Sequence, residues 1–106
     1  MDLAVGCRDW LDGVGGLARA SVDLVYVDPP FSTGRRQVGT AGAYEDAWES
    51  LDAWIDWLRP RLAVSRDVLK DTGSILLHVD WRTSHRARCV LDDLFGSDRF
   101  VNHLIW

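Results

Sequence analysis

Two acidic residues, Asp28 and Asp80, each follow a short apolar run that is typical of a β-strand. Residues 22–27 are rich in β-branched and aromatic side chains and stop against two prolines, as a strand buried on both faces would. Residues 74–79 form a second such run. The carboxyl ends of parallel strands meet at one edge of a sheet, where ligands bind. We therefore expect both carboxylates to face one crevice, although a turn or cap is the commoner role of such a residue.

Asp28 is followed by Pro29, Pro30 and Phe31, and we call these four residues the acceptor motif. Successive prolines fix φ and lack N–H donors, so the carbonyls here are expected to point outward as rigid acceptors. Phe31 offers a flat face for stacking a base, worth roughly 1–3 kcal/mol. Two acceptors that hold the hydrogens of an exocyclic amino group free its nitrogen for attack on a methyl sulfonium. That amino group is buried in a duplex, so the base must be flipped out.

Helical spacing of apolar residues follows the acceptor motif in two adjoining stretches. The first covers residues 44–58 and the second covers residues 60–70, which begin with a proline that is expected to kink or restart the helix. A further helix with a clean apolar stripe is capped by Thr83 or Ser84 and closed by Gly96. Helices therefore separate the predicted strands.

The remaining segments complete an α/β pattern. Residues 32–43 hold three glycines and are predicted to be a mobile loop beside the site, and residues 9–20 predict only a poor helix. Residues 100–106 predict a last strand. Right-handed crossovers then give about three parallel strands with flanking helices, a partial doubly wound, Rossmann-like sheet. Because sheets that bind a nucleotide-like cofactor usually have roughly five or more strands, a missing half is expected.

Four segments together resemble one protein family. Residues 21–34 resemble the catalytic motif of bacterial site-specific DNA amino-methyltransferases, in the class that places this motif before the motif for S-adenosyl-L-methionine (AdoMet). Residues 44–48, 68–82 and 100–106 resemble the segments that follow it in that family, in the same order. The resemblance identifies residues 1–106 as the N-terminal catalytic half of a methyltransferase domain, with the AdoMet-binding half absent.

The resemblance implies AdoMet-dependent methylation of the amino group of a flipped base in double-stranded DNA. Asp28 and the carbonyl of Pro29 would hold the amino group, Pro30 completes the motif, and Phe31 would stack on the base. Adenine is favoured over cytosine because Asp rather than Ser opens the motif. A restriction subunit or a second chain is a candidate partner. Further substrate contacts are predicted for residues near the motif and at the end of the second strand: Thr33, Arg35, Arg36, His78 and Asp80.

The overall composition restricts the classes of protein that this chain can represent. It carries 12 basic and 16 acidic side chains, for a formal net charge of -4. Because phosphate neutralisation supplies much of the affinity for DNA, we do not expect a stand-alone DNA-binding domain. No apolar run approaches the ~20 residues that span a bilayer, and the start lacks a signal-peptide pattern. A cytoplasmic protein without membrane contact is expected.

Other kinds of site have little support in the sequence. Cys7 and Cys89 lack the spacing of a disulfide framework or a zinc site, and no metal is expected. A nucleotide hydrolase would need a phosphate loop with Lys and Ser or Thr, which residues 1–106 lack. The Phe-x-Gly-x-Gly cofactor loop of the methyltransferases is also missing from these residues. This favours one alternative for the chain taken alone: a truncated or decayed fragment that at most contributes an interaction surface.

Overall fold

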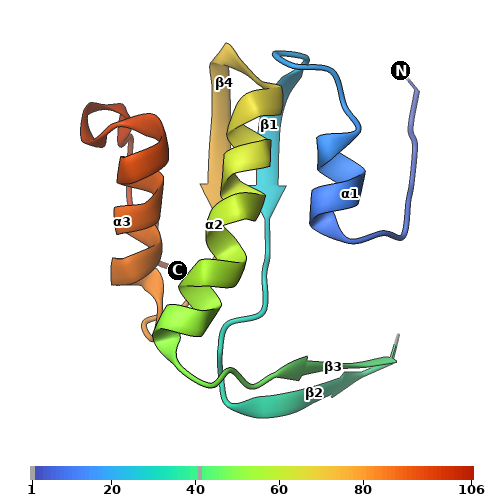
Figure 1. Cartoon of the computed structure of the whole chain (residues 1–106), viewed down its shortest axis with the longest axis vertical. Helices are drawn as coiled ribbons and strands as arrows, with labels where there is room; N and C mark the ends of the chain where they lie inside the picture. Colours follow the sequence, from blue (N-terminus) through green and yellow to red (C-terminus); the bar gives the residue numbers. More distant parts are fainter. Residues whose placement is uncertain (1, 41) are drawn as a thin grey trace.

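The structure is a computed structural model that describes residues 2–40 and 42–106, apart from the side chains of residues 36, 37, 44 and 45. Over these residues the chain is an α/β structure with two small sheets (Figure 1). Strand β1 (Val22–Val27) pairs in parallel with β4 (Leu69–Leu77), and β2 (Arg35–Gly39) pairs antiparallel with β3 (Gly42–Asp46). The helices are α1 (Trp10–Gly15), α2 (Leu51–Val68), α3 (Ser84–Phe95) and the 3₁₀ helix η1 (Ser97–Arg99).

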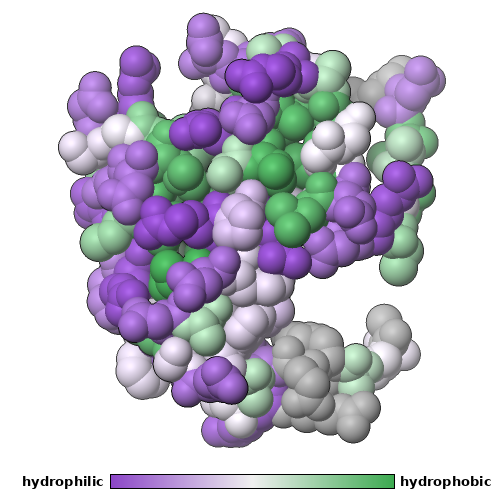
Figure 2. Space-filling view, in the orientation of Figure 1, coloured by the Kyte–Doolittle hydropathy of each residue, from purple (hydrophilic) through white to green (hydrophobic). Residues whose placement is uncertain are grey.

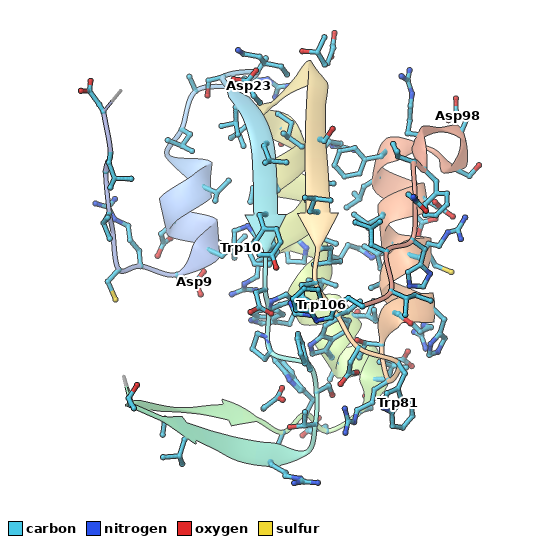
Figure 3. The ribbon with its side chains drawn as sticks, turned by 180° about the vertical axis from the view of Figure 1, so that it is seen from behind. Asp9, Trp10, Asp23, Trp81, Asp98 and Trp106 are labelled. Carbon is cyan, nitrogen blue, oxygen red and sulfur yellow. The ribbon has the colours of Figure 1, made fainter. Side chains whose placement is uncertain are left out.

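The parallel sheet is covered on one face. Side chains alternate between the two faces of a strand, and Ile75 and Leu77 of β4 pack against the core beneath α2. On the other face Leu24, Tyr26 and Leu76 are exposed, and this face carries no helix when the described chain is seen from behind (Figure 3). The expectation that the first strand is buried on both faces is therefore wrong for this chain. A second covering layer is needed for that, and the described residues do not supply it.

Helix α2 is the centre of the core. Ser50 caps it by accepting a hydrogen bond from the N–H of Ala53 at 3.0 Å. Trp54, Leu58 and Leu62 recur every four residues and are fully buried. Pro60 lies on the exposed side, and the helix runs through it from Leu51 to Val68 rather than restarting there. An interior proline costs about 3 kcal/mol, which this long buried face offsets.

Helix α3 closes the core from the side. Its residues Ala87 and Val90 are buried against Trp54 and its neighbours on α2. Apolar residues gather along the seams between the helices, and polar residues cover the outside (Figure 2). The helix ends as predicted at Gly96, whose φ of 96° is rarely adopted by L residues. In the described part of the chain no helix has the length and apolarity needed to cross a bilayer.

The predicted third strand at residues 100–106 is wrong. These residues have no regular structure, and Val101, Leu104, Ile105 and Trp106 are exposed. An apolar, β-branched segment becomes a strand only when a neighbouring strand takes up its backbone hydrogen bonds. The parallel sheet of the described chain therefore has two strands instead of about three.

The predicted mobile loop at residues 32–43 is also wrong, because it contains β2 and the start of β3. The hairpin pairs Val38 with Ala43 and Arg35 with Asp46. Gly42 adopts a φ of 134°, which L residues rarely adopt. This glycine therefore lets the chain enter β3 at the end of the hairpin. The predicted helix at residues 44–58 consequently begins only at residue 51. The glycine-rich stretch at residues 9–20 forms the short helix α1, in keeping with its poor helix propensity.

Candidate active site

The acceptor motif lies directly after β1, at the edge where both parallel strands end. Asp28, Pro29, Pro30 and Phe31 line a pocket of about 380 Å³. The β2–β3 hairpin lies beyond this same edge of the sheet (Figure 1). The strand therefore delivers the motif to the position where an open α/β sheet binds its ligands.

His78 brings the carboxylate and the aromatic ring of the motif together. Its Nδ1 atom lies 3.3 Å from Oδ1 of Asp28, and its ring meets the Phe31 ring edge-on with 5.0 Å between centroids. The backbone N–H of His78 donates to the carbonyl of Val27 at 2.8 Å, so β1 holds the backbone of His78 beside the start of the motif. The side chains of Asp28 and His78 are 60% and 45% exposed, and a ligand can reach both.

The carbonyl of Pro30 corrects one expectation for the motif. It accepts a hydrogen bond of 2.8 Å from Nε1 of Trp54, a fully buried residue of α2. This carbonyl is therefore directed at the helix and does not point outward as an acceptor. The reason is that the N–H of a buried indole needs a hydrogen-bond acceptor, and the Pro30 carbonyl is the acceptor within its reach. The sequence placed Trp54 in the helical stretch at residues 44–58, but its spacing did not predict this contact with the motif.

Asp46 is a second residue of the site to which we assigned no role from the sequence. Its side chain is buried, with 1% of its surface exposed. Its carboxylate accepts hydrogen bonds from the N–H of Ser32 at 2.6 Å and from the N–H of Thr33 at 3.0 Å. The Thr33 hydroxyl donates to the same carboxylate at 2.6 Å. The signal for Asp46 was its place in the Tyr-x-Asp-x-Trp segment of the family resemblance.

The contacts of Asp80 are those of a turn residue. Its carboxylate accepts a hydrogen bond from the N–H of Arg82 at 2.9 Å and pairs with the Arg82 guanidinium. Its carbonyl accepts from the N–H groups of Thr83 and Ser84, at the start of α3. Asp80 is not among the residues that line the pocket of the acceptor motif. Asp80 therefore makes the contacts of a turn residue, and its predicted contact with substrate stays a prediction.

The other residues predicted to contact substrate lie on or before the hairpin. The Thr33 hydroxyl is directed at Asp46. Arg35 is exposed on β2 and lies opposite Asp46 in the hairpin register. Arg36 also belongs to β2, but its side chain lies outside the described part of the structure.

The described residues do not form a recognisable cofactor cradle. Gly13 and Gly15 lie within α1 and Gly16 caps it, so these glycines do not form a strand-to-helix turn of the kind that approaches a nucleotide-like cofactor. Over the ranges that the structure describes, His, Cys, Asp and Glu side chains form no group of three that could hold a metal ion. The chemistry that these residues support is thus the binding of a planar ligand through hydrogen-bond acceptors and an aromatic face.

Comparison with known proteins matches this site to a family. Residues 22–106 match the family of N6 and N4 methyltransferases that is described as DNA methylase. The chain belongs to this family. The matched range begins at β1 and includes the acceptor motif, His78 and Asp46, so the family resemblance that we drew from the motif and its companion segments is confirmed.

Relatives of this chain are named as methyltransferases or as Mod subunits of type III restriction-modification enzymes. The chain is 33% identical over 100 residues to the Type II methyltransferase M.EcaI of Enterobacter cloacae, covering 88% of this chain and 22% of that protein. It is 27% identical over 113 residues to the Mod subunit of the type III enzyme StyLTI of Salmonella typhimurium, covering 81% of this chain and 17% of that protein. The DNA adenine methyltransferase YhdJ of Escherichia coli is 39% identical over 57 residues, covering 54% of this chain and 18% of that protein. The chain spans about a fifth of the length of these relatives.

Proposed function

We propose that this chain holds a flipped base, adenine in preference to cytosine, while its exocyclic amino group is methylated in double-stranded DNA. The observation that carries the proposal is the pocket after β1, where the Asp28 carboxylate and the Phe31 ring both contact His78. Membership of the DNA methylase family supports the reaction type. The parallel pair β1–β4 and its helices are consistent with part of a Rossmann-like sheet.

Three residues of the motif have a chemical role in this proposal. Asp28 and the Pro29 carbonyl accept the two amino hydrogens, which turns the nitrogen lone pair away from the ring and toward the methyl donor. Phe31 stacks on the base and orients it. His78 contacts both Asp28 and Phe31 and so stands next to the carboxylate and the ring that bind the base. These residues bind and orient, and the proposal needs neither a covalent nucleophile nor a metal ion.

AdoMet is the proposed methyl donor, because it supplies an electrophilic methyl group on sulfur. The described residues do not fit a cradle for it, since their glycines at positions 13–16 belong to α1 and its cap. We therefore assign residues 1–106 the role of a base-holding half and give none of them a role in binding AdoMet. The share of the relatives that this chain spans, about a fifth, is compatible with such a division.

The choice of base and the partners are finer points of the proposal. Asp28 at the head of the motif and a relative named as a DNA adenine methyltransferase both favour adenine. Two relatives are named as Mod subunits of type III restriction-modification enzymes, which supports a restriction subunit as a candidate partner. A second chain that supplies the cofactor site is the other candidate.

The direct test uses the complete protein, labelled AdoMet and unmethylated DNA, followed by mass spectrometry of the nucleosides. We expect N6-methyladenine from the wild type and a loss of about 10²–10³-fold in rate for Asp28→Ala, the size seen when one stabilising group is removed. Asp56→Ala, which removes an exposed carboxylate from α2, is the matched control and should retain full activity. N4-methylcytosine would overturn the preference for adenine, and an active Asp28→Ala enzyme would overturn the acceptor role. A wild-type protein that methylates no DNA would support the fragment alternative instead.

A further inference from the structure

The backbone just after Phe31 has a conformation that needs outside support. Ser32 has a φ of 63°, in the left-handed region that residues with a Cβ atom rarely adopt. Gly34 follows with a φ of 78°, where glycine meets no such penalty. The chain therefore turns sharply between the stacking residue and β2, and Ser32 is the residue at which this turn is strained.

Asp46 supplies the support through both carboxylate oxygens. Oδ1 accepts from the N–H of Ser32 at 2.6 Å, and Oδ2 accepts from the N–H and the hydroxyl of Thr33. An ionised carboxylate only accepts hydrogen bonds, so its chemistry matches three converging donors. Charge-assisted bonds of this kind are short and strong, and the burial of Asp46 keeps water from replacing them.

Asp46 is itself fixed by the hairpin. It is the last residue of β3 and stands opposite Arg35 in the antiparallel register. Its own carbonyl accepts a hydrogen bond from the N–H of Gly34 at 2.9 Å. The segment between Phe31 and β2 is thus bound to one residue through both its side chain and its main chain.

Phe31 lies between two anchored neighbours. On its N-terminal side the carbonyl of Pro30 is held by Trp54, and on its C-terminal side Ser32 is held by Asp46. A residue whose backbone is fixed on both sides has little freedom to move its ring away from Asp28. Displacing a reacting group by about 1 Å can cost about a hundredfold in rate, so anchoring of this kind matters for catalysis.

We propose that Asp46 is a positioning residue of the base site, which holds the strained turn after Phe31 so that the ring stands beside Asp28. The inference rests on the proposed function and deepens it, because it makes the hairpin a structural part of the base site. Asp46 acts through Ser32 and Thr33 and does not itself touch the base.

The test is a double-mutant cycle in the complete protein. Asp46→Asn keeps the shape of the side chain but turns one acceptor into a donor that faces other donors, and Thr33→Val removes only the hydroxyl. We expect Asp46→Asn to lower kcat by about tenfold to a hundredfold, with KM for AdoMet unchanged. The double variant should lose little more than Asp46→Asn alone, because both changes break the same contact. Losses that simply add would overturn the inference, since Thr33 would then act independently of Asp46.

Ser50→Ala is the matched control for lost stability. It removes the cap of α2 four residues after Asp46 but touches no residue of the motif. Its melting temperature should fall while kcat holds, and an equal fall in kcat for Ser50→Ala and Asp46→Asn would reduce Asp46 to a purely structural role.

Amide hydrogen exchange at residues 32 and 33 provides a readout that needs no activity. Both amides should be protected in the wild type and exposed in Asp46→Asn, and retained protection would overturn the inference. A wild-type protein that methylates no DNA would defeat the proposed function. The exchange measurement would still decide whether Asp46 holds the turn.

Discussion

Replacement of Trp54 by phenylalanine should destabilise the protein through the loss of one hydrogen bond at the acceptor motif. The indole of Trp54 is fully buried and its Nε1 donates to the Pro30 carbonyl at 2.8 Å. Phenylalanine fills most of the ring volume but has no N–H. The Pro30 carbonyl would then lack its donor in a partly buried place, and the acceptor motif would lose its contact with α2.

The size of this effect follows from two terms. A partly buried acceptor left without a donor costs about 1–3 kcal/mol. Loss of the far end of a buried indole removes apolar contacts worth about 1–2 kcal/mol, at roughly 0.8 kcal/mol for each CH₂-sized group. Together Trp54→Phe should lower the free energy of unfolding by about 3 kcal/mol.

Trp48→Phe is the matched control because it makes the same chemical change nearby. The Nε1 atom of Trp48 is buried without a hydrogen-bond partner in the described structure, so its removal relieves a cost. Trp48 is also only partly buried, and we expect a loss below about 1 kcal/mol. Urea unfolding of the complete protein, followed by circular dichroism, measures both values, and methylation assays should show a lower rate for Trp54→Phe. Equal losses of stability in the two variants would refute the role of the Trp54 hydrogen bond.

Three further predictions concern stability away from the site. In Gly73→Ala the added Cβ would lie 2.8 Å from a leucine methyl carbon and 3.1 Å from each of two backbone oxygens, so a loss of about 1–3 kcal/mol is expected on urea unfolding. Gly15→Ala meets no atom within 4 Å and lies in α1, so the same measurement should show a gain of about 0.5–1 kcal/mol. The Leu11 N–H, and then the Arg61 guanidinium, hold the pKa of the Asp9 carboxyl below its usual value of 3.8. The resulting stabilisation is complete above pH 3.8 and is lost as the pH falls through the lower pKa of the folded state, so Asp9→Asn should weaken the acid dependence of unfolding in that range.

Several elements could be predicted from local sequence alone. Strand β1 has the predicted bounds, and α3 begins after Thr83 and ends before Gly96 as predicted, although the Thr83 side chain makes no capping hydrogen bond. These signals are local because a run of β-branched residues, a proline stop and a glycine after a helix act within a few residues of the chain. The position of the acceptor motif after β1 follows from the same local pattern.

Other elements depended on neighbours that are distant in the sequence. Residues 100–106 have strand-like composition but lack a partner strand, and the glycine-rich residues 32–43 form half a hairpin because β3 pairs with β2. Pro60 is tolerated inside α2 because the opposite face of that helix is buried. In each case tertiary packing outweighs local propensity.

The acceptor motif itself, its place at the end of a strand and the family to which it points were determined by the sequence, because residue types and short spacings define them. Only the tertiary structure decided how that motif is held. Trp54 contacts Pro30 of the motif from 24 residues away in the chain, and Asp46 holds Ser32, the residue just after the motif, from 14 residues away. Such contacts depend on the hairpin register and on the face that α2 presents to the sheet, and neither is encoded in the spacing of residues 28–31.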